Sequence, residues 1–474
     1  MAYNKQIPLI IDLDGTLIHT DLLHESVLYL LKIKPLFIFL LPFWLFNGKA
    51  RLKSNLVGVI NLPVASLPYN SDLIAYIQEE RFLGRRIILC TASHQILAKS
   101  VADHLGIFDE VFASTEFINL SGPEKAKALG AQYGKEGFDY AGNSHVDLVV
   151  WENARSVIIV NGSPSLLRKV SSLFMVHKIF PRPTVGVKPW IKVFRLHQWV
   201  KNILIFMPAF AAHTAMTAYV WKDLILAFLS FSLCASFVYI LNDLLDLESD
   251  RRHLRKRYRP FASGLVPIWI GIVLAPILIL SSLILAVNVG MSFLFWILIY
   301  LVLTSFYSWG IKRLVIVDVL TLAILYTLRI VAGAAAIEMP LSFWLLAFSI
   351  FLFLSLAFIK RDSELRSDYG EAQQLHGRGY ITSDSSLIQQ LGVSSGYAAV
   401  LVLALYINSE NIIKLYRVPE MIWGAVPLLL WWLSWMGFQA NRGLMHDDPI
   451  VFAIKDKTSL FIGALFLGAF ALAQ

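Results

Sequence analysis

YILNDLLDLESDRRHLRKRYRPFASG, residues 239–264, joins the end of a long apolar segment to a dense group of charged side chains. Asp243, Asp246 and Asp250 are spaced i, i+3 and i+7, which places the three carboxylates on one face of a continuing helix. They repel one another unless a cation lies among them. A solvated helix end is the alternative, but the basic residues that follow do not favour it. The stretch therefore predicts a membrane helix that ends in a site for Mg²⁺ and a diphosphate.

The composition of the whole chain agrees with a membrane protein. Of the 474 residues, 57% are hydrophobic and only 16% charged, and the mean hydropathy is +0.63, which is too apolar for a soluble protein of this length. Two cysteines exclude a disulfide-rich scaffold. The net charge of +8 comes from basic residues beside the membrane segments, so we expect anionic head groups and phosphorylated substrates as partners, and no nucleic acid.

The hydropathy changes near residue 189. Before it, apolar and polar residues alternate as in a globular domain, and after it one apolar stretch follows another. We predict nine spans: 199–218, 223–242, 265–287, 291–309, 315–337, 342–359, 392–408, 420–440 and 458–474. The loops after even-numbered spans hold fifteen Lys and Arg residues and those after odd-numbered spans hold three. This difference predicts a multi-pass protein of the cell (inner) membrane, with the N-terminal domain and both sites in the cytoplasm.

The N-terminal part predicts a doubly wound α/β domain. Short apolar strands alternate with helical stretches, as a parallel sheet covered on both faces requires. The predicted strands are Leu9–Leu13, Arg86–Leu89, Phe138–Ala141 and Val157–Val160, and the predicted helices include Asp72–Leu83 and Gln95–Leu105. The predicted organisation is a domain at 1–165 with a cap at about 18–80, a linker at 166–189, and an all-α membrane domain at 190–474.

One segment of the cap is unusually apolar. Leu28–Phe46 contains Lys32, Lys34 and two prolines, and its uninterrupted apolar run is 12 residues, shorter than a membrane span. It either packs inside the cap or lies in the membrane interface with its lysines at the head groups. We favour the interface, which would let the pocket receive a phosphate carried on a lipid.

The first predicted strand runs directly into Asp12-Leu-Asp14-Gly-Thr. Two carboxylates at the carboxyl end of a strand can enter one pocket, where one attacks phosphorus and the other handles the proton of the leaving oxygen. A turn with an Asx-cap is the alternative interpretation. Thr91, which ends the next strand, can bind a phosphoryl oxygen, and Lys125 can supply a cation. The loop after a further strand holds Asn143 and Asp147, oxygen ligands suited to Mg²⁺.

These motifs together resemble the haloacid dehalogenase superfamily of phosphatases, over about residues 5–165. The resemblance implies that Asp12 is the nucleophile and Asp14 the acid and base, and that Thr91 and Lys125 bind phosphate. Asp12, Asp14, Asn143 and Asp147 would form the metal site. Asn143 stands where this family commonly has aspartate, which removes one negative charge from that site and weakens, without excluding, activity.

Further polar groups lie near the cytoplasmic ends of other spans. Lys312 precedes a span that carries Asp318, a candidate second metal ligand, and Arg329, which we expect to pair inside the bundle because ionisable groups within a span need partners. Two more groups form the rim of the site: Lys360 and Arg361 with Glu364, and Asp447 with Asp448. Lys201 and Asn202 either point into the site or anchor the chain at the interface.

The membrane part resembles the UbiA-type intramembrane prenyltransferase superfamily, from about Trp190 onward, through NDxxDxxxD at Asn242–Asp250 and KRxRPxASG at 256–264. RLHQWVKN, YSxxIKR and KRxxE are more similar to its polyprenyl-phosphate phosphoribosyltransferase branch. That resemblance implies Asp243 and Asp246 as catalytic residues, Asp243, Asp246, Asp250 and Asp318 as metal ligands, and Lys201, Asn202, Asn242, Lys256, Arg257, Arg259, Lys312, Lys360 and Arg361 as substrate-binding residues.

The expected function is a bifunctional, Mg²⁺-dependent enzyme. It would transfer 5-phosphoribosyl from phosphoribosyl diphosphate to a polyprenyl phosphate, and the N-terminal domain would then remove the 5-phosphate. The main alternative is a prenyltransferase that moves a polyprenyl chain from its diphosphate to an aromatic or other small acceptor. A transporter or lipid-binding scaffold is a further, non-enzymatic alternative.

Overall fold

A computed structural model of the chain describes residues 7–183, 186–211, 218–367, 378–409, 416–445 and 448–473. The chain forms two compact units. Met1–Phe194 and Ile240–Ala275 make the first, and Arg195–Tyr239 and Pro276–Gln474 make the second. The aspartate-rich stretch therefore belongs to the same unit as the N-terminal domain, and the predicted single boundary at 190 does not describe this division.

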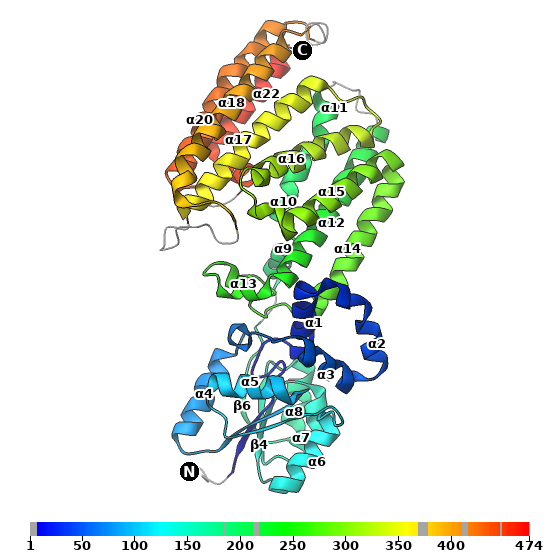
Figure 1. Cartoon of the computed structure of the whole chain (residues 1–474), viewed down its shortest axis with the longest axis vertical. Helices are drawn as coiled ribbons and strands as arrows, with labels where there is room; N and C mark the ends of the chain where they lie inside the picture. The colour runs from blue at the N-terminus through cyan, green and yellow to red at the C-terminus, as the bar shows by residue number, and fades with distance from the viewer. Residues whose placement is uncertain are drawn as a thin grey trace. The chain divides into compact units, whose positions relative to one another are not determined.

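A six-stranded parallel sheet in the order β3-β2-β1-β4-β5-β6 forms the centre of the first unit (Figure 1). Its strands are β1 (Leu9–Ile11), β2 (Ile87–His94), β3 (Glu110–Ser114), β4 (Asp139–Gly142), β5 (Ser156–Val160) and β6 (Val176–Phe180). Leu9 and Ile11 pack into the apolar core on one face, and Ile10 packs into the core on the other. The predicted doubly wound α/β fold is confirmed.

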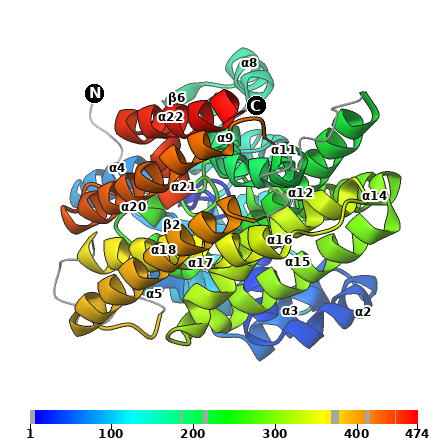
Figure 2. The same cartoon turned by 90° about the horizontal axis from the view of Figure 1, so that it is seen from above.

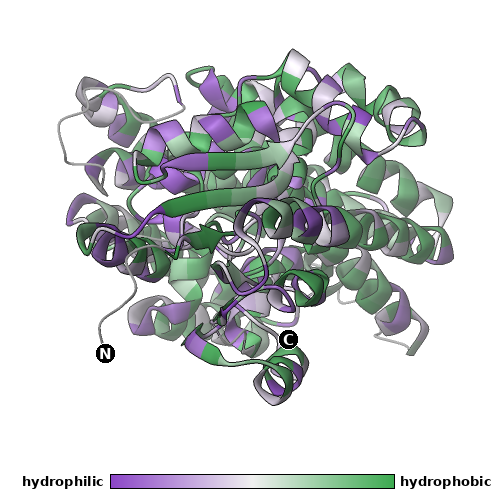
Figure 3. Cartoon of the chain, turned by 90° about the horizontal axis from the view of Figure 1, so that it is seen from below, coloured by the Kyte–Doolittle hydropathy of each residue, from purple (hydrophilic) through white to green (hydrophobic). Residues whose placement is uncertain are grey.

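Helices cover both faces of this sheet. The core of Leu9 and Ile11 includes residues of the helices α4 (Ser71–Phe82) and α5 (Gln95–Leu105), together with Leu22. The core of Ile10 includes residues of three, α6 (Gly122–Tyr133), α7 (Leu148–Trp151) and α8 (Pro164–Leu173). The hydropathy colours show strands of the sheet that are mostly apolar beside helices that carry both polar and apolar residues (Figure 3).

Neither edge strand, β3 or β6, was predicted from the sequence. β6 lies within the predicted linker, 166–189, yet it pairs in parallel with β5, so that prediction is wrong over much of its length. Three of its five residues are exposed, because an edge strand has fewer neighbours than a central one. It therefore lacks the apolar run that marks a buried strand. α9 (Val187–Val193) follows, and residues 184 and 185 lie outside the described part of the chain.

A helical cap is inserted between β1 and α4, whereas the predicted cap, about 18–80, also took in most of α4. It comprises α1 (Leu22–Ile33), η1 (Pro35–Phe39), α2 (Leu41–Phe46), α3 (Lys49–Val59) and η2 (Val64–Ser66). Leu36, Phe39, Phe43 and Phe46, spaced by three or four residues, are 76%, 72%, 66% and 90% exposed. This exposure contradicts the alternative that Leu28–Phe46 packs wholly inside the cap. An exposed apolar stripe flanked by lysines is instead typical of a segment in the membrane interface.

Among the described residues, seven helices are long and apolar enough to cross a membrane. They are α12 (Ala218–Leu245), α14 (Ile268–Val289), α15 (Met291–Trp309), α16 (Val317–Ala336), α17 (Phe343–Ser367), α18 (Ser385–Ile407) and α20 (Ala425–Asn441), the last two extended at their starts by η7 (Thr382–Asp384) and η8 (Pro419–Gly424). α15, α16, α17 and α18 lie side by side in chain order (Figure 1, Figure 2).

Of the two remaining predicted spans, the ninth, at 458–474, coincides with a shorter apolar helix, and only the first differs from its prediction. The ninth is the 17-residue helix α22 (Lys457–Ala473), which follows the short helix α21 (Pro449–Lys455). The first, at 199–218, is not one long helix in its described part. It begins with α10 (Leu196–Trp199), continues as η4 (Val200–Phe206) and α11 (Met207–Ala211), and then reaches residues 212–217, which lie outside the described part.

A buried ion-pair network at the start of β4 gives a stability prediction. Asp139 accepts hydrogen bonds from Nε and Nη2 of Arg155 at 3.0 and 2.6 Å and also pairs with the buried Arg85. Asp139→Ala leaves Arg85 with one carboxylate fewer, so we expect it to destabilise this unit by about 3 kcal/mol. Thermal unfolding of the full-length protein in detergent measures the loss. Arg86→Ala removes an exposed pair with Glu110 and should change stability by less than about 1 kcal/mol.

The same network predicts a pH dependence. Burial alone would raise the pKa of Asp139, but Arg155 and Arg85 hold it below its usual value. A carboxyl whose pKa is lowered by folding stabilises the protein above its unfolded pKa of about 3.9, and this stabilisation is lost as the pH falls through the folded pKa. The difference in stability between the wild type and Asp139→Ala should therefore be full at neutral pH and should shrink below about pH 4. A constant difference over this range would contradict the assignment.

Candidate active sites

The chemistry of the first unit lies at the carboxyl ends of the central strands. β1 lies between β2 and β4, where the order of strands along the chain reverses. Ile11 is in register with Leu89 and Ala141, so the residues after these positions reach the same edge of the sheet. Open α/β sheets bind ligands at such a switch point. Asp12 and Asn143 follow β1 and β4 directly, as the sequence predicts.

Asp12 is held by a buried cation. Nζ of Lys125, on α6, donates to Oδ1 of Asp12 at 2.7 Å and to the Tyr140 hydroxyl at 2.8 Å, and the hydroxyl of Thr16 donates to Oδ2 at 3.2 Å. Burial alone would lower the pKa of Lys125, but Asp12 beside it raises that pKa above its usual value. Lys125 therefore stays charged. Burial raises the pKa of Asp12 above its usual value, and the charge of Lys125 opposes that shift and favours the ionised carboxylate that a nucleophile needs.

Asp14 has a different environment. Its Oδ2 accepts from the hydroxyls of Ser93 at 2.6 Å and Thr91 at 3.5 Å, and its Oδ1 accepts from the backbone N–H of Leu22 at 2.8 Å. Burial, with the nearby charge of Asp21, raises the pKa of Asp14 to about 7. A carboxyl that exchanges its proton near neutral pH suits an acid and base. Ser93 escaped prediction, although it stands only two residues after Thr91.

Asn143 and Asp147 have separate roles in the loop after β4. Gly15 has φ +74°, and a Cβ there would lie 2.0 Å from Nδ2 of Asn143, so the amide packs directly against the Asp12–Asp14 loop. Oδ2 of Asp147 accepts from the backbone N–H groups of Asn143 and Ser144, both at 3.0 Å. Its Oδ1 accepts from the Tyr140 hydroxyl at 3.1 Å. These bonds orient the loop and argue against the predicted role of Asp147 as a metal ligand.

The aspartate-rich stretch forms a helix with a break. α12 ends at Leu245 and α13 (Leu247–Arg252) begins after Asp246, but the N–H groups of Asp246 and Asp250 still donate to the carbonyls four residues earlier, at 2.9 and 2.8 Å. Asp243 and Asp250 are buried, and both accept from Nη1 of Arg259, at 3.0 and 2.6 Å. Two of the three predicted carboxylates therefore converge on one cation, and Asp246 occupies the break between the helices.

The two buried carboxylates are occupied by a guanidinium in this structure. Among the described residues no cluster of three or more His, Cys, Asp and Glu side chains is poised to hold a metal. Asp243 and Asp250 both pair with the guanidinium of Arg259, and their carboxylates are the type of oxygen ligand that Mg²⁺ prefers. Of the neighbouring predicted phosphate-binding residues in η5 (Lys256–Tyr258), Lys256 is half-buried and Arg257 is exposed, donating to the Tyr258 hydroxyl at 2.8 Å.

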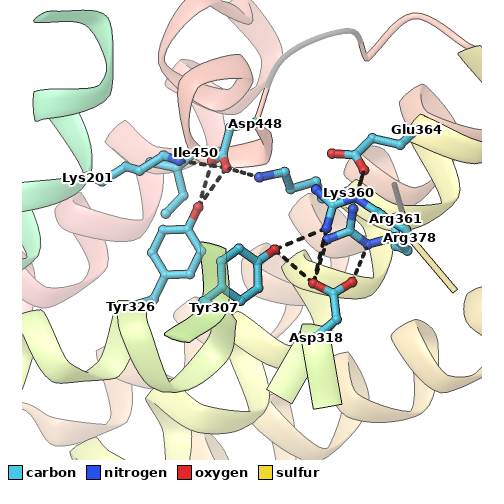
Figure 4. A network of polar contacts seen from close by, with 10 residues as sticks. All are labelled: Lys201, Tyr307, Asp318, Tyr326, Lys360, Arg361, Glu364, Arg378, Asp448 and Ile450. Carbon is cyan, nitrogen blue, oxygen red and sulfur yellow. Dashed lines mark hydrogen bonds and ion pairs between the residues drawn. The ribbon is translucent and has the colours of Figure 1, made fainter. Parts of the chain in front are cut away.

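The second unit contains a separate charged cluster around Asp448 (Figure 4). Oδ2 of Asp448 accepts from Nζ of Lys201 at 2.7 Å and Nζ of Lys360 at 3.1 Å, and the Tyr326 hydroxyl donates to the same oxygen at 2.7 Å. Burial alone would raise the pKa of Asp448, but the two lysines hold it well below its usual range. The structure thus brings together two predicted substrate-binding lysines from η4 and α17. Asp447 lies outside the described residues.

Asp318, at the start of α16, lies in a neighbouring cluster (Figure 4). Arg361 contacts both of its carboxylate oxygens, at 2.9 and 3.1 Å, Arg378 approaches at 3.3 Å, and the Tyr307 hydroxyl donates at 2.8 Å. Glu364 pairs with both arginines. With two guanidinium groups on one carboxylate, the arrangement argues against the predicted metal role of Asp318. It also assigns Arg361 to a buried ion pair.

Three further predicted residues have different environments. Nδ2 of the buried Asn202 donates to the Ser232 hydroxyl at 2.9 Å, and its Oδ1 accepts from Nε of Arg329 at 2.9 Å. The expectation that Arg329 pairs inside the bundle is confirmed. Lys312 lies in η6 (Ile311–Arg313), between α15 and α16. Asn242 lies on α12, one residue before Asp243.

Comparisons with known proteins cover both parts of the chain. The family model described as "UbiA prenyltransferase family" matches residues 204–444. "Uncharacterized protein y4nM" of Sinorhizobium fredii is 35% identical over all of this chain and 92% of its own length. "Nodulation protein NoeC" of Azorhizobium caulinodans is 38% identical over 56% of this chain and 87% of its own length. The "Decaprenyl-phosphate phosphoribosyltransferase" of Mycolicibacterium smegmatis is 27% identical over 60% of this chain and 94% of its own length.

Two solved structures match one part of the chain each. A UbiA homologue from Archaeoglobus fulgidus covers 60% of this chain and 99% of its own, with 18% identity and a TM-score of 0.46. A HAD family hydrolase from Salmonella enterica serovar Typhi covers 36% of this chain and 68% of its own, with 16% identity and a TM-score of 0.28. The family match extends over half of the chain, and one relative is similar over all of this chain. The chain therefore belongs to the UbiA prenyltransferase family.

Proposed function

We propose that the chain is a bifunctional membrane enzyme that makes polyprenyl-phosphoryl ribose. Its membrane part would transfer 5-phosphoribosyl from phosphoribosyl diphosphate to a polyprenyl phosphate, and its N-terminal part would remove the 5-phosphate. The convergence of Asp243 and Asp250 on one cation carries the first half of the proposal. The similarity to proteins named decaprenyl-phosphate phosphoribosyltransferase supports this choice of donor and acceptor.

The transfer needs charge stabilisation more than proton transfer. A phosphate oxygen of the lipid would form a bond to C1 of ribose as the bond from C1 to the diphosphate breaks, and the diphosphate would leave with the electron pair. Mg²⁺ held by Asp243 and Asp250 would act as a Lewis acid toward the departing diphosphate. Arg259 and Lys256 follow these aspartates closely in the chain and can bind diphosphate oxygens. A lipid phosphate is ionised at neutral pH, so it needs no general base.

The second step would use the carboxylates after β1. An oxygen of Asp12 would attack phosphorus, and the ribose oxygen would leave with a proton from Asp14. Water would then cleave the aspartyl phosphate with Asp14 as base. Lys125, 2.7 Å from Asp12, would stabilise the charge on the phosphoryl oxygens. If Mg²⁺ takes part, Asp12 and Asn143 are the residues that could hold it.

The proposal also includes the cellular location of both steps. We propose that both active sites are in the cytoplasm, at the inner membrane, as the Lys and Arg count predicts. The exposed apolar stripe of Leu36, Phe39, Phe43 and Phe46 would rest in the membrane interface. A phosphatase held there would meet a substrate that cannot leave the membrane, and the covalent tether between the two parts would raise its local concentration further.

Asp243→Asn should reduce the formation of lipid-linked phosphoribose by about 100-fold, because it removes half of the charge that holds the cation. The measurement is the transfer of label from phosphoribosyl diphosphate to polyprenyl phosphate in membranes. Asp223→Asn, on the same helix α12, is the matched control and should keep wild-type transfer. If wild-type membranes make no labelled lipid from this donor but do prenylate a small acceptor, the prenyltransferase alternative replaces the proposal.

Asp12→Asn should abolish the release of phosphate from the lipid product while leaving its formation intact, because the amide cannot act as the nucleophile. The mass of the lipid product shows this directly, as the 5-phosphate is retained. Asp103→Asn, an exposed change on α5, is the control and should release phosphate normally. Asp243→Asn should retain the release of phosphate, and Asp12→Asn should retain the transfer. The retained activity shows in each case that the variant protein is folded. Phosphate release by Asp12→Asn would show that the nucleophile is another group.

A further inference from the structure

The phosphatase pocket has a wall that comes from the transferase part of the chain. The pocket holds about 600 Å³. Asp14 and Asn143, at the carboxyl ends of the strands, form one side of it. Tyr258, Gly264 and Trp269, from the segment after the aspartate-rich helix, form another. Both sides belong to the same compact unit, although more than a hundred residues and a membrane helix separate them in the chain.

A buried ion pair fastens the start of this segment to the cap. The carboxylate of Glu25, on α1, accepts two hydrogen bonds from Arg251, at 2.5 and 3.1 Å, and both side chains are buried. Nε of Arg251 also donates to the carbonyl of Ala262 at 2.9 Å, which ties the loop to the helix α13. Opening this contact would leave a buried charge without its partner, which is costly. The segment is therefore a fixed part of the pocket.

The loop also packs directly on the phosphatase loop. Gly264 has φ +73°, and a Cβ there would lie 2.5 Å from Cβ of His19. Only glycine permits both this backbone conformation and this approach. The phosphatase loop is also held by Asn161, whose Nδ2 donates to the carbonyl of Gly15 at 2.9 Å. Gly264 is the last residue of the KRxRPxASG motif. The basic residues of this motif suit a diphosphate, and its end completes the phosphatase pocket.

The two sides of the pocket differ in chemistry. Asp14 and Asn143 offer polar groups to a phosphate, and Arg182 adds a cation to the lining. Tyr258 and Trp269 line the other side and are 65% and 52% exposed, so their rings are available to a sugar. Trp269 is the second residue of the membrane helix α14, the position where tryptophan commonly meets the lipid head groups. The pocket thus extends from Asp14, two residues after the candidate nucleophile Asp12, to the start of a membrane span.

We propose that residues 258–269 are the substrate-recognition wall of the phosphatase pocket, and that this wall selects a phosphosugar attached to a membrane lipid over soluble phosphate esters. The inference rests on the proposed phosphatase function of Asp12. A soluble sugar phosphate can reach Asp14 but has no chain that continues past Trp269 into the membrane interface. The lipid-linked substrate makes both sets of contacts, and its selection prevents the enzyme from hydrolysing phosphorylated sugars of the cytosol.

The test compares two substrates on the full-length protein in lipid nanodiscs. Polyprenyl-phosphoryl ribose 5-phosphate and free ribose 5-phosphate are hydrolysed in parallel, and we expect a kcat/KM about 100-fold higher for the lipid-linked substrate. Trp269→Ala should raise the KM for the lipid-linked substrate about tenfold, through loss of one aromatic contact, with little change in kcat. Trp269→Phe keeps a ring and should stay within about threefold of the wild type. Trp309→Ala, an exposed tryptophan at the end of α15, is the control.

The outcomes separate this inference from the proposed function. Equal kcat/KM for the two substrates, or an unchanged KM in Trp269→Ala, would overturn the inference while leaving the phosphatase intact. Release of phosphate from neither substrate by the wild type would overturn the phosphatase and the inference together. Transfer of phosphoribosyl to the lipid, measured on the same preparation, shows that Trp269→Ala is folded. A raised KM with intact transfer supports the wall as the recognition element.

Discussion

Pairing of buried carboxylates with a cation is the interaction on which both candidate sites depend. A single ionised group in a low-dielectric interior costs more than a typical fold can offset, so it needs a partner of opposite charge in a fixed position. Lys125 does this for Asp12, and Arg259 does it for Asp243 and Asp250. The same pairing prepares the sites for phosphates. A phosphate can join the cation that holds a carboxylate, and a metal ion can join the carboxylates that hold a cation.

The aspartate-rich stretch has two physical roles because it lies between two kinds of structure. It continues a membrane helix, α12, and it packs within the same compact unit as the parallel sheet. Glu25 on the cap pairs with Arg251, immediately after Asp250, so the cap supports the helix α13 beside Asp243 and Asp250. Disturbing this contact would affect the geometry of both sites. The two proposed active sites are therefore linked by this contact as well as by the continuous chain.

Central elements could be predicted because burial on both faces leaves a clear pattern in sequence. β1 is apolar at every position and is followed at once by Asp12, so both the strand and the candidate nucleophile are recognisable. β6 escaped because an edge strand needs no apolar run. Asp318 was placed correctly near the end of a span. Its partner Arg378 lies 60 residues away in the chain, and no local spacing in the sequence indicates such a pair. The break at Asp246 likewise interrupts a helical spacing that continues on either side.

The sequence by itself determined the fold classes, the membrane helices and the types of group that can handle phosphates, because hydropathy and local spacing depend on neighbours along the chain. Only the tertiary structure decided which charges meet. It paired Asp448 with Lys201 and Lys360, and it set Gly264 against the loop that carries Asp14. Such contacts join residues that lie far apart in the chain. Their energy depends on distance and burial in three dimensions, and neither quantity can be obtained from the order of residues alone.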